Sequence, residues 1–308
     1  MIVWADLDAR ARGLAGRLLG RARLEALARS PDLRALAAAL ERSGYERVTD
    51  GSSFVSDARA LDRAVRRTMA SRLRVLERWA AGRASALAVV FEEEEARNLR
   101  ALLRGALSNA PAAARLSSTI PTRRLPEGAL AELARLHGVR EIVAVLLVFR
   151  HPYADALADE ARLEAPNAFR LEALLFERFA ERALGIARGA ELRRFVQQTV
   201  DLQRAFAAIE SAADRAAEAR KAAKTFAGSE LAPMLRRHAD DPAALEDAAL
   251  GVRIAEQSRA ARLDPLGPAP VLLYVLRLRA EAADVRRIIA GVALGAPAPT
   301  LVSQLVTV

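Results

Sequence analysis

The stretch DPLGPAPVLLYVLRLRAEAADVRRIIAG, residues 264–291, carries the pattern from which the fold can be predicted. A turn rich in proline and glycine leads into an apolar segment, which continues with interspersed arginine and acidic residues. Its second half contains apolar residues spaced at 0, 3, 4 and 7, which is one face of a helix: Val285, Ile288, Ile289 and Val292. Asp284 stands just before this face, and Glu281 stands three residues earlier. We therefore predict a long amphipathic helix that begins at a sharp turn.

The same frame occurs twice more in the chain. In EEARNLRALLRGAL (94–107) Asn98 and Glu95 precede the apolar face, and in QQTVDLQRAFAAIES (197–211) Asp201 and Gln198 precede it. The faces themselves are Leu99, Leu102, Leu103 and Ala106 in the first copy, and Leu202, Ala205, Phe206 and Ile209 in the second. The shared pattern is [EQ]xx[ND][LV][RQ]x[ALI][LFI], and its copies divide the chain roughly into thirds.

Two further similarities accompany this frame. A short pattern lies upstream of each copy, at residues 61–65, 171–175 and 245–249. LARSPDLRALAAALERSGY (27–45) and LARLHGVREIVAVLLVFRHPY (133–153) also match in helical phase and in their closing tyrosine. We predict three related helical units, and since no Gly/Ser linker separates them, we expect them to pack as one compact body. Their predicted bounds are 1–115, 116–225 and 226–308.

The composition also favours an all-α fold. Apolar residues make up 52% of the 308 residues and aromatic residues only 5%. Alanine and leucine dominate, and both are strong helix formers, so a sandwich or barrel is disfavoured. Turn residues interrupt the helical pattern, among them Gly51, Ser52 and Ser53. Ser30 and Asp241 each precede a proline, and we predict that both cap a helix whose first residue is that proline.

The net charge of +9 comes almost wholly from arginine. Such a surface can meet nucleic acid, anionic lipid or an acidic protein. Enrichment in arginine and alanine is also typical of a GC-rich genome, which is the simpler interpretation.

Cysteine is absent from the chain, so disulfides, thiolate metal sites and a cysteine nucleophile are excluded. This fits a reducing compartment. The start, MIVWADLDARARG, has no basic region followed by an apolar run, so we expect no signal peptide. Residues 288–308 carry no charge, but Pro297 and Pro299 interrupt them. We predict a last core helix that ends near Leu294, then a turn and a short packed tail, and not a membrane span.

No catalytic or cofactor motif is present. The sequence lacks GxxxxGK[ST], GxGxxG, GxSxG and HExxH. His137, His151 and His238 lie far apart and have no metal-ligand spacing. We therefore expect no enzyme activity, no cofactor and no metal site in this chain.

One charge cluster is a candidate contact for a partner. Glu92, Glu93, Glu94 and Glu95 stand in a row, and Glu93 can pair with Arg97 one turn later. We expect a solvated helix N-terminus here, with an acidic contact for a basic partner as the alternative. Three arginines share a stripe opposite the leucine face, and they form either a solvated surface or a surface for a partner or phosphate: Arg97, Arg100 and Arg104.

These features together resemble the C subunit of bacterial and archaeal V/A-type ATPases, whose eukaryotic relative is subunit d of the vacuolar ATPase. The C-terminal stretch that begins at Asp264 is similar to the family's signature of a turn, a tyrosine helix, an NLR motif and a Gly-x-Pro close. DARARGLAGRLL (8–19), EARNLRALLRGAL (95–107) and RLEALLFERFAERAL (170–184) resemble three further family helices. Asp284 and Val285 depart from the usual Asn-Leu of the last repeat.

The resemblance implies a three-lobed, funnel-like helical protein with pseudo-threefold symmetry. It implies a non-catalytic rotor adapter that links the central-stalk D/F subunits to the membrane proteolipid (c/K/L) ring and transmits torque. It also implies a cytoplasmic location in a prokaryote, peripheral to the membrane and without nucleic acid. The alternative is a helical-repeat scaffold that binds a protein or RNA through its arginine stripes; it predicts units of about 34 to 45 residues, shorter than those seen here.

Overall fold

A computed structural model describes residues 4–46, 57–80, 84–117 and 119–307. It is 76% helical, and no strand occurs in these ranges, so the all-α fold class is confirmed. The funnel-like arrangement of three lobes stays a prediction. The turn predicted at Gly51, Ser52 and Ser53 lies outside the described residues.

The helices form two compact units. Unit 1 consists of Met1–Trp79 together with Ala219–Val308, and unit 2 consists of Ala80–Glu218. Unit 1 thus combines the two ends of the chain, whereas unit 2 is continuous. The three-unit division from the sequence repeats, residues 1–115, 116–225 and 226–308, stays a prediction.

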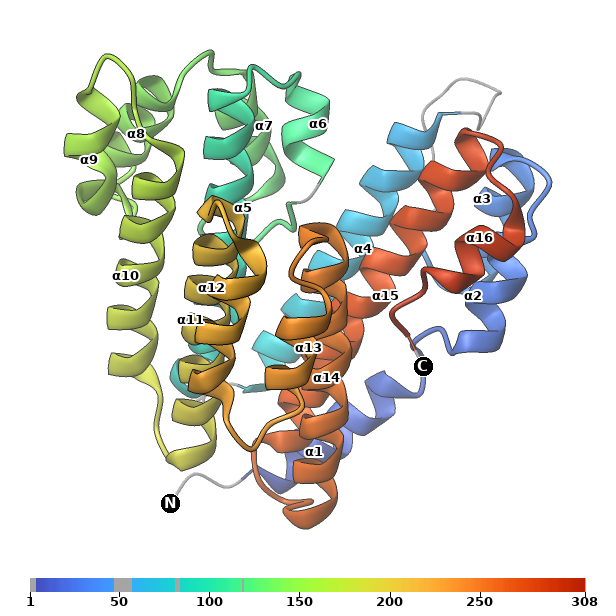
Figure 1. Ribbon diagram of the computed structural model, residues 1–308. Helices are drawn as coiled ribbons and strands as arrows, with labels where there is room; N and C mark the ends of the chain where they lie inside the picture. The colour runs from blue at the N-terminus through green and yellow to red at the C-terminus, as the bar shows by residue number, and fades with distance from the viewer. Residues whose placement is uncertain (1–3, 47–56, 81–83, 118, 308) are drawn as a thin grey trace. The chain divides into compact units, whose positions relative to one another are not determined.

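Unit 1 is built around one long helix, α15 (Figure 1). Besides α15 (Ala269–Ala293), it contains α1 (Ala5–Ala15), α2 (Arg21–Ala28), α3 (Leu33–Arg42), α4 (Ala58–Ala80, but for its last residue), η2 (Ala223–Phe226), α13 (Leu231–Arg237), α14 (Pro242–Leu263) and α16 (Ala298–Ser303). α14, α1, α2, α3 and α16 all pack against α15. α15 is buried on nearly all sides, including Val285, Ile288 and Ile289 of the predicted face, while Val292 is half-buried.

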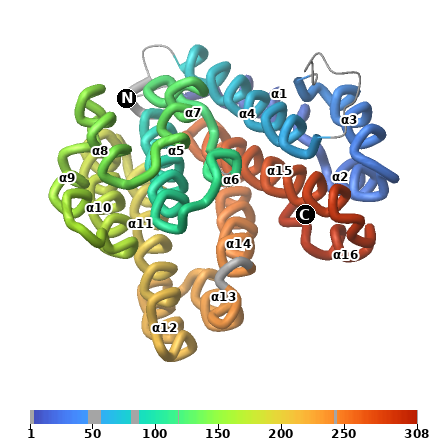
Figure 2. Tube along the Cα trace, turned by 90° about the horizontal axis from the view of Figure 1, so that it is seen from above, coloured from blue at the N-terminus to red at the C-terminus, as the bar shows by residue number. Residues whose placement is uncertain are grey.

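Unit 2 is built in a similar way around α5 (Ala84–Leu107). The other helices are α6 (Ala112–Ser117), α7 (Glu127–Arg135), α8 (Val139–Val148), α9 (Ala154–Arg162), α10 (Ala168–Ile186) and α11 (Ala190–Ser211); α12 (Arg215–Ala222) crosses the boundary to unit 1. α5 packs against α6, α7, α8, α10 and α11, and α9 packs against α8 and α10 (Figure 2). The predicted apolar faces of α5 and α11 are fully buried.

One glycine in each central helix allows a short helix to approach closely. Gly105 stands seven residues after Asn98, and Gly291 stands seven residues after Asp284. A Cβ at Gly105 would lie 2.5 Å from the side chain of Arg115 in α6, and one at Gly291 would lie 2.2 Å from Leu301 in α16. A larger residue at either position would require the neighbouring side chain to move. In both frames, the residue seven positions after the polar residue is thus a glycine that contacts a short helix.

Of the two predicted N-cap residues, Asp241 is confirmed and Ser30 is wrong. Asp241 caps α14, because its Oδ1 accepts a hydrogen bond from the N–H of Ala244, and the helix begins at Pro242 as expected. Ser30 is not a cap. Helix α3 begins at Leu33, and its N-cap is Asp32, whose carboxylate accepts from the N–H of Ala35. Aspartate competes well with serine for this position, which explains the shift of two residues.

Candidate functional site

Glu281 in α15 joins the two ends of the chain within unit 1. Its side chain is 1% exposed, and it accepts three hydrogen bonds from different segments. The donors are the N–H of Leu19 at 2.5 Å, the hydroxyl of Tyr45 at 2.6 Å and the guanidinium of Arg72 at 2.5 Å. Burial lowers the pKa of Arg72, but the charge of Glu281 outweighs it and the net pKa is raised. Burial, reinforced by Glu281, raises the pKa of the Tyr45 hydroxyl.

Asp284, one turn further along α15, binds the C-terminal tail. It is fully buried, and its carboxylate accepts from the backbone N–H groups of Val306 at 2.7 Å and Thr307 at 2.8 Å. Arg287 pairs with the same carboxylate at 3.1 Å and donates to the carbonyl of Gln304 at 2.7 Å. The tail after α16 is therefore a packed part of unit 1, as the sequence predicted.

Unit 2 contains a related network around α5. Asn98 is fully buried and makes a two-way contact with the backbone of Ile120. Its Nδ2 donates to the Ile120 carbonyl, and its Oδ1 accepts from the Ile120 N–H, both at 2.8 Å. One turn earlier, Glu95 accepts from the hydroxyl of Thr122 at 3.2 Å and from Arg124 at 3.1 Å.

Glu92, one turn before Glu95 in α5, belongs to the same network because both carboxylates accept from Arg124. It accepts hydrogen bonds from Arg182 in α10 at 2.6 and 2.9 Å, from Arg124 at 2.8 Å and from the hydroxyl of Tyr153 at 3.0 Å. Burial raises the pKa of Glu92, but the bonds from Arg182 and Arg124 outweigh it and the net pKa is lowered. The carboxylate is therefore held ionised between two cations.

A third set of ion pairs links α5 to α10. Glu172 pairs with Arg100 at 3.1 Å and forms a bidentate pair with Arg104, which also reaches Glu210 at 2.7 Å. In unit 1 the corresponding pair is Arg286 with Asp62, at 2.8 Å. Arg100 and Arg286 each stand two residues after the polar residue of the frame.

The two units thus repeat one arrangement of polar contacts. Ile120 lies 22 residues after Asn98, and Val306 lies 22 residues after Asp284. Five residues of unit 2 have an equivalent in unit 1. The residue of unit 2 is given first: Asn98 and Asp284, Arg100 and Arg286, Glu172 and Asp62, Tyr153 and Tyr45, and Arg182 and Arg72. One difference exists: Tyr153 and Arg182 reach Glu92, one turn before Glu95, whereas Tyr45 and Arg72 reach Glu281.

The third copy of the frame keeps the helix but not these contacts. Within the part of the chain that the structure describes, the contacts of the Asp201 carboxylate in α11 are to Gln197 and Arg204 of its own helix. The repeated frame therefore predicted the apolar faces in all three copies, and long-range polar contacts occur at the frame position in two of them.

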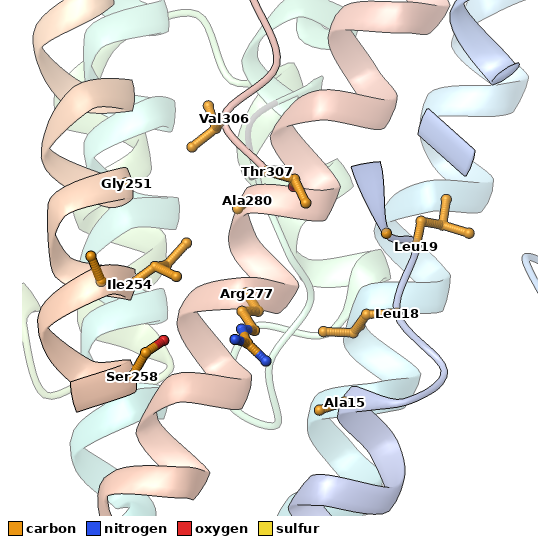
Figure 3. A pocket seen from close by; sticks show the side chains of 12 residues that line it. Ala15, Leu18, Leu19, Gly251, Ile254, Ser258, Arg277, Ala280, Val306 and Thr307 are labelled. Carbon is orange, nitrogen blue, oxygen red and sulfur yellow. The ribbon is translucent and has the colours of Figure 1, made fainter. Parts of the chain in front are cut away.

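A cavity of about 520 Å³ lies within unit 1 (Figure 3). Its walls come from α14, α15, the segment after α1 and the tail, and small or apolar side chains predominate (Figure 3). Polar groups are few: Ser258, Arg277 and Thr307, whose hydroxyl is buried and makes no hydrogen bond. The lining contains no Asp, Glu, His or Cys side chain.

Among the described residues, no three His, Cys, Asp or Glu side chains come together as a metal site. His137 sits beside Glu141, which accepts from its backbone N–H, and His238 follows α13 as its C-cap residue. Within the same ranges, no helix has the length and apolarity that crossing a bilayer requires.

The six candidate interface residues all lie in α5. Glu92, Glu93 and Glu94 are buried. The prediction of a solvated helix N-terminus is wrong, because α5 begins at Ala84 and the glutamates lie more than two turns inside it. The charge of Glu92 is balanced by Arg124 and Arg182, which are distant in sequence, a compensation that the local pattern could not reveal.

The three arginines of the stripe have different surroundings. Arg100 is mostly buried against Glu172, with a 13% exposed side chain. Arg97 and Arg104 each keep 40% of the side chain exposed, and Arg97 lies 3.8 Å from Glu93, the predicted pair. The use of the six residues as a partner contact stays a prediction, and only Arg97 and Arg104 offer substantial surface to a partner.

Several residues of the networks were not predicted from the sequence, among them Arg72, Arg124, Arg182 and Asp62. A signal for two of them existed. The matched segments 27–45 and 133–153 both end in a tyrosine, and an arginine follows each tyrosine after a similar interval, at Arg72 and Arg182. A buried tyrosine needs a polar partner, so these pairs pointed to buried carboxylates elsewhere.

His151 makes unit 2 sensitive to acid. It is buried between Glu95, 3.7 Å away, and Arg124 and Arg182, and burial lowers its pKa to about 4. The unfolded chain therefore binds a proton near pH 6.5 while the folded chain does not, so stability falls as pH falls. Between pH 7 and pH 5 we expect the free energy of unfolding of unit 2 to drop by about 2 kcal/mol from this group.

Urea unfolding followed by far-UV circular dichroism at several pH values measures this effect. The variant His151→Phe has no titrating group there and is expected to show a flatter pH dependence over this window. Burial raises the pKa of Glu95, which adds stability on acidification, and the net pKa of Glu92 is lowered, with the opposite effect. Both carboxylates are present in the variant, so the difference between the two proteins isolates His151. Equal slopes would contradict the prediction.

Comparison with known proteins supplies one match. The family model described as ATP synthase (C/AC39) subunit matches residues 7–223, more than two thirds of the chain. The matched range contains α5, α10 and most of the network of unit 2. No curated protein sequence matches the chain.

Proposed function

Because the chain belongs to the ATP synthase (C/AC39) subunit family, we propose that it is the rotor adapter of a V/A-type ATPase. Family membership associates it with an ATPase complex as a rotor-type subunit, and such subunits are generally not catalytic themselves. In the proposed role, the central-stalk D/F subunits bind one surface and the membrane proteolipid (c/K/L) ring binds another. The chain transmits torque between ATP chemistry and ion movement.

The single observation that carries this proposal is the family match over residues 7–223. The buried networks support it physically. A torque-transmitting part must resist deformation, and each unit is crosslinked internally by carboxylates that bind two or three segments at once. Such fully bonded networks in a low-dielectric interior rigidify a fold. The proposal implies a cytoplasmic position, peripheral to the membrane through partner subunits, in a prokaryote whose genome is GC-rich.

We propose Arg97 and Arg104 as part of the contact for the shaft. Their side chains are 40% exposed on α5, and a basic surface favours an acidic partner. Arg97 is the better probe, because Arg104 also bonds Glu172 and its loss would disturb the fold.

Co-purification with the D/F subunits and with the proteolipid ring of the same organism tests the proposal. We expect the chain to retain both partners at low salt and to release the shaft as salt rises. The variant Arg97→Glu should weaken shaft binding about tenfold, whereas Arg135→Glu, at an exposed arginine that pairs with Glu132 in α7, should not.

Failure to retain either the shaft or the ring would overturn the adapter role. The alternative, a scaffold for RNA, predicts salt-sensitive retention of RNA in a filter assay instead. Equal losses for Arg97→Glu and Arg135→Glu would leave the adapter role but remove α5 as the contact.

A further inference from the structure

A second cleft in unit 1 is lined by an unusual number of arginines. It has a volume of about 980 Å³ and lies between α1, α2, α3, α4 and α15. The lining arginines are Arg17, Arg23, Arg42, Arg72 and Arg78. Glu46 is the one carboxylate among the lining residues, and it already pairs with Arg67 at 3.4 Å. The cleft is therefore strongly cationic.

Four of these arginines are not used by the fold. Arg72 is paired with Glu281, but the side chains of Arg17, Arg23, Arg42 and Arg78 are exposed and have no ion pair or hydrogen bond within the described ranges. Exposed arginines that only serve solubility are normally dispersed among acids. Here they come from the turn after α1 and from α2, α3 and α4, and they line one cleft, which is the arrangement that surrounds an anion.

The floor of the cleft supplies an independent observation. Tyr274 in α15 lines it and is 1% exposed, yet its hydroxyl makes no hydrogen bond. A buried hydroxyl without a partner is costly, so such groups in folded proteins call for an explanation. A ligand oxygen that accepts a hydrogen bond from the Tyr274 hydroxyl would explain it. Ser71 in α4, which also carries a hydroxyl, lines the same cleft.

We propose that this cleft binds a compact polyanion that carries two or more phosphate groups. Guanidinium groups match phosphate oxygens bidentately, and four unpaired ones around one cleft favour several phosphates over a single carboxylate. The volume suits a small molecule or a lipid headgroup. This site is independent of the proposed adapter function, since it uses no residue of α5.

Titration calorimetry with inorganic tripolyphosphate at physiological salt tests the proposal. We expect saturable binding, with inorganic phosphate much weaker. The double variant Arg42→Ala with Arg78→Ala should lower the affinity about a hundredfold, since each lost charge-assisted contact costs about tenfold. The matched control removes one exposed arginine from each of the same two helices outside the cleft, Arg34→Ala with Arg74→Ala, and should bind like the natural chain.

Tyr274→Phe separates a binding role from a structural one. Removal of an unbonded hydroxyl should leave the thermal midpoint unchanged or raise it, while tripolyphosphate affinity falls several-fold. Flotation with phosphatidylcholine vesicles, with and without a phosphatidylinositol bisphosphate, distinguishes the sources. If the natural chain binds the bisphosphate vesicles and the double variant does not, the ligand is a lipid headgroup. If the chain binds tripolyphosphate but not the vesicles, the ligand is a free polyanion. Either result supports the site.

Three outcomes would overturn it. The first is the absence of binding to both tripolyphosphate and the bisphosphate vesicles. The second is an equal loss in the cleft variant and in its control, which would indicate attraction by net charge. The third is oligoglutamate binding as tight as tripolyphosphate, which would indicate an acidic protein segment as the occupant.

Discussion

Replacing Glu281 by alanine is expected to lower the free energy of unfolding of unit 1 by about 3–5 kcal/mol. The carboxylate is buried and satisfies Leu19, Tyr45 and Arg72 together. Without it, the guanidinium of Arg72, with a side chain only 15% exposed, remains as an uncompensated charge. A backbone N–H and a hydroxyl also lose their acceptor, and each buried orphan adds to the cost.

The tryptophans give a selective measurement of this effect. The chain has two, Trp4 and Trp79, and both belong to unit 1. Urea unfolding followed by tryptophan fluorescence therefore reports unit 1, while far-UV circular dichroism reports all helices. We expect Glu281→Ala to shift the fluorescence transition to much lower urea and to shift the remaining helical signal less.

A matched control is available on the surface of the same unit. Glu46 pairs with Arg67, and both side chains are nearly half exposed. Glu46→Ala should cost at most about 1 kcal/mol. Combining Arg72→Ala with Glu281→Ala should cost less than the sum of the single changes, because Arg72 is no longer stranded. If Glu281→Ala costs no more than Glu46→Ala, the carboxylate is not a central crosslink of unit 1.

The helices and their buried faces could be predicted from the sequence because they depend on local spacing. Leu99, Leu102 and Leu103 are buried as the 0, 3, 4, 7 pattern requires, and α15 ends at Ala293 next to the expected Leu294. Periodicity and turn residues act within a few positions, and this is the range over which sequence patterns are reliable.

The buried ion pairs and hydrogen bonds could not be predicted in this way, because they join residues far apart in the sequence. Glu92 and Arg182 are 90 residues apart, and Glu281 and Tyr45 are 236 apart. A glutamate in an amphipathic helix has the same local pattern whether it faces water or a distant arginine. The row Glu92 to Glu95 therefore resembles a solvated helix start, although all four side chains are buried and Glu92 and Glu95 are paired with arginines distant in sequence. For the same reason the sequence could not predict the cleft, whose arginines come from three helices and the turn after α1.

Asn98→Asp is expected to destabilise unit 2 by about 3–5 kcal/mol at pH 7, although the two side chains have nearly the same shape. Asn98 is fully buried and both donates to and accepts from the backbone of Ile120. A carboxylate only accepts, so one of its oxygens would face the Ile120 carbonyl, and among the described residues no cation is bonded to this position. Burial of such a charge is costly.

The effect should reverse on acidification. A protonated aspartic acid has one donor and remaining acceptor capacity, which restores both bonds to Ile120. The pKa of the introduced carboxyl group is raised in the folded state above its unfolded value near 4, so the folded chain binds the proton first. The stability gap between the variant and the natural chain should therefore shrink as the pH falls from 7 toward about 5. Urea unfolding by circular dichroism, with tryptophan fluorescence as the internal reference for unit 1, measures this gap.

Asp284→Asn in unit 1 is the control, because it makes the opposite exchange at the corresponding position. Asp284 accepts two backbone N–H groups and pairs with Arg287, so it needs acceptor oxygens and a negative charge. An amide replaces one acceptor by a donor that points at an N–H, and it removes the charge. We expect a loss of about 2–3 kcal/mol that does not shrink as the pH falls. If both substitutions destabilised the protein equally little at pH 7, the contacts with the backbone of Ile120 and of Val306 would not explain why one position is asparagine and the other aspartate.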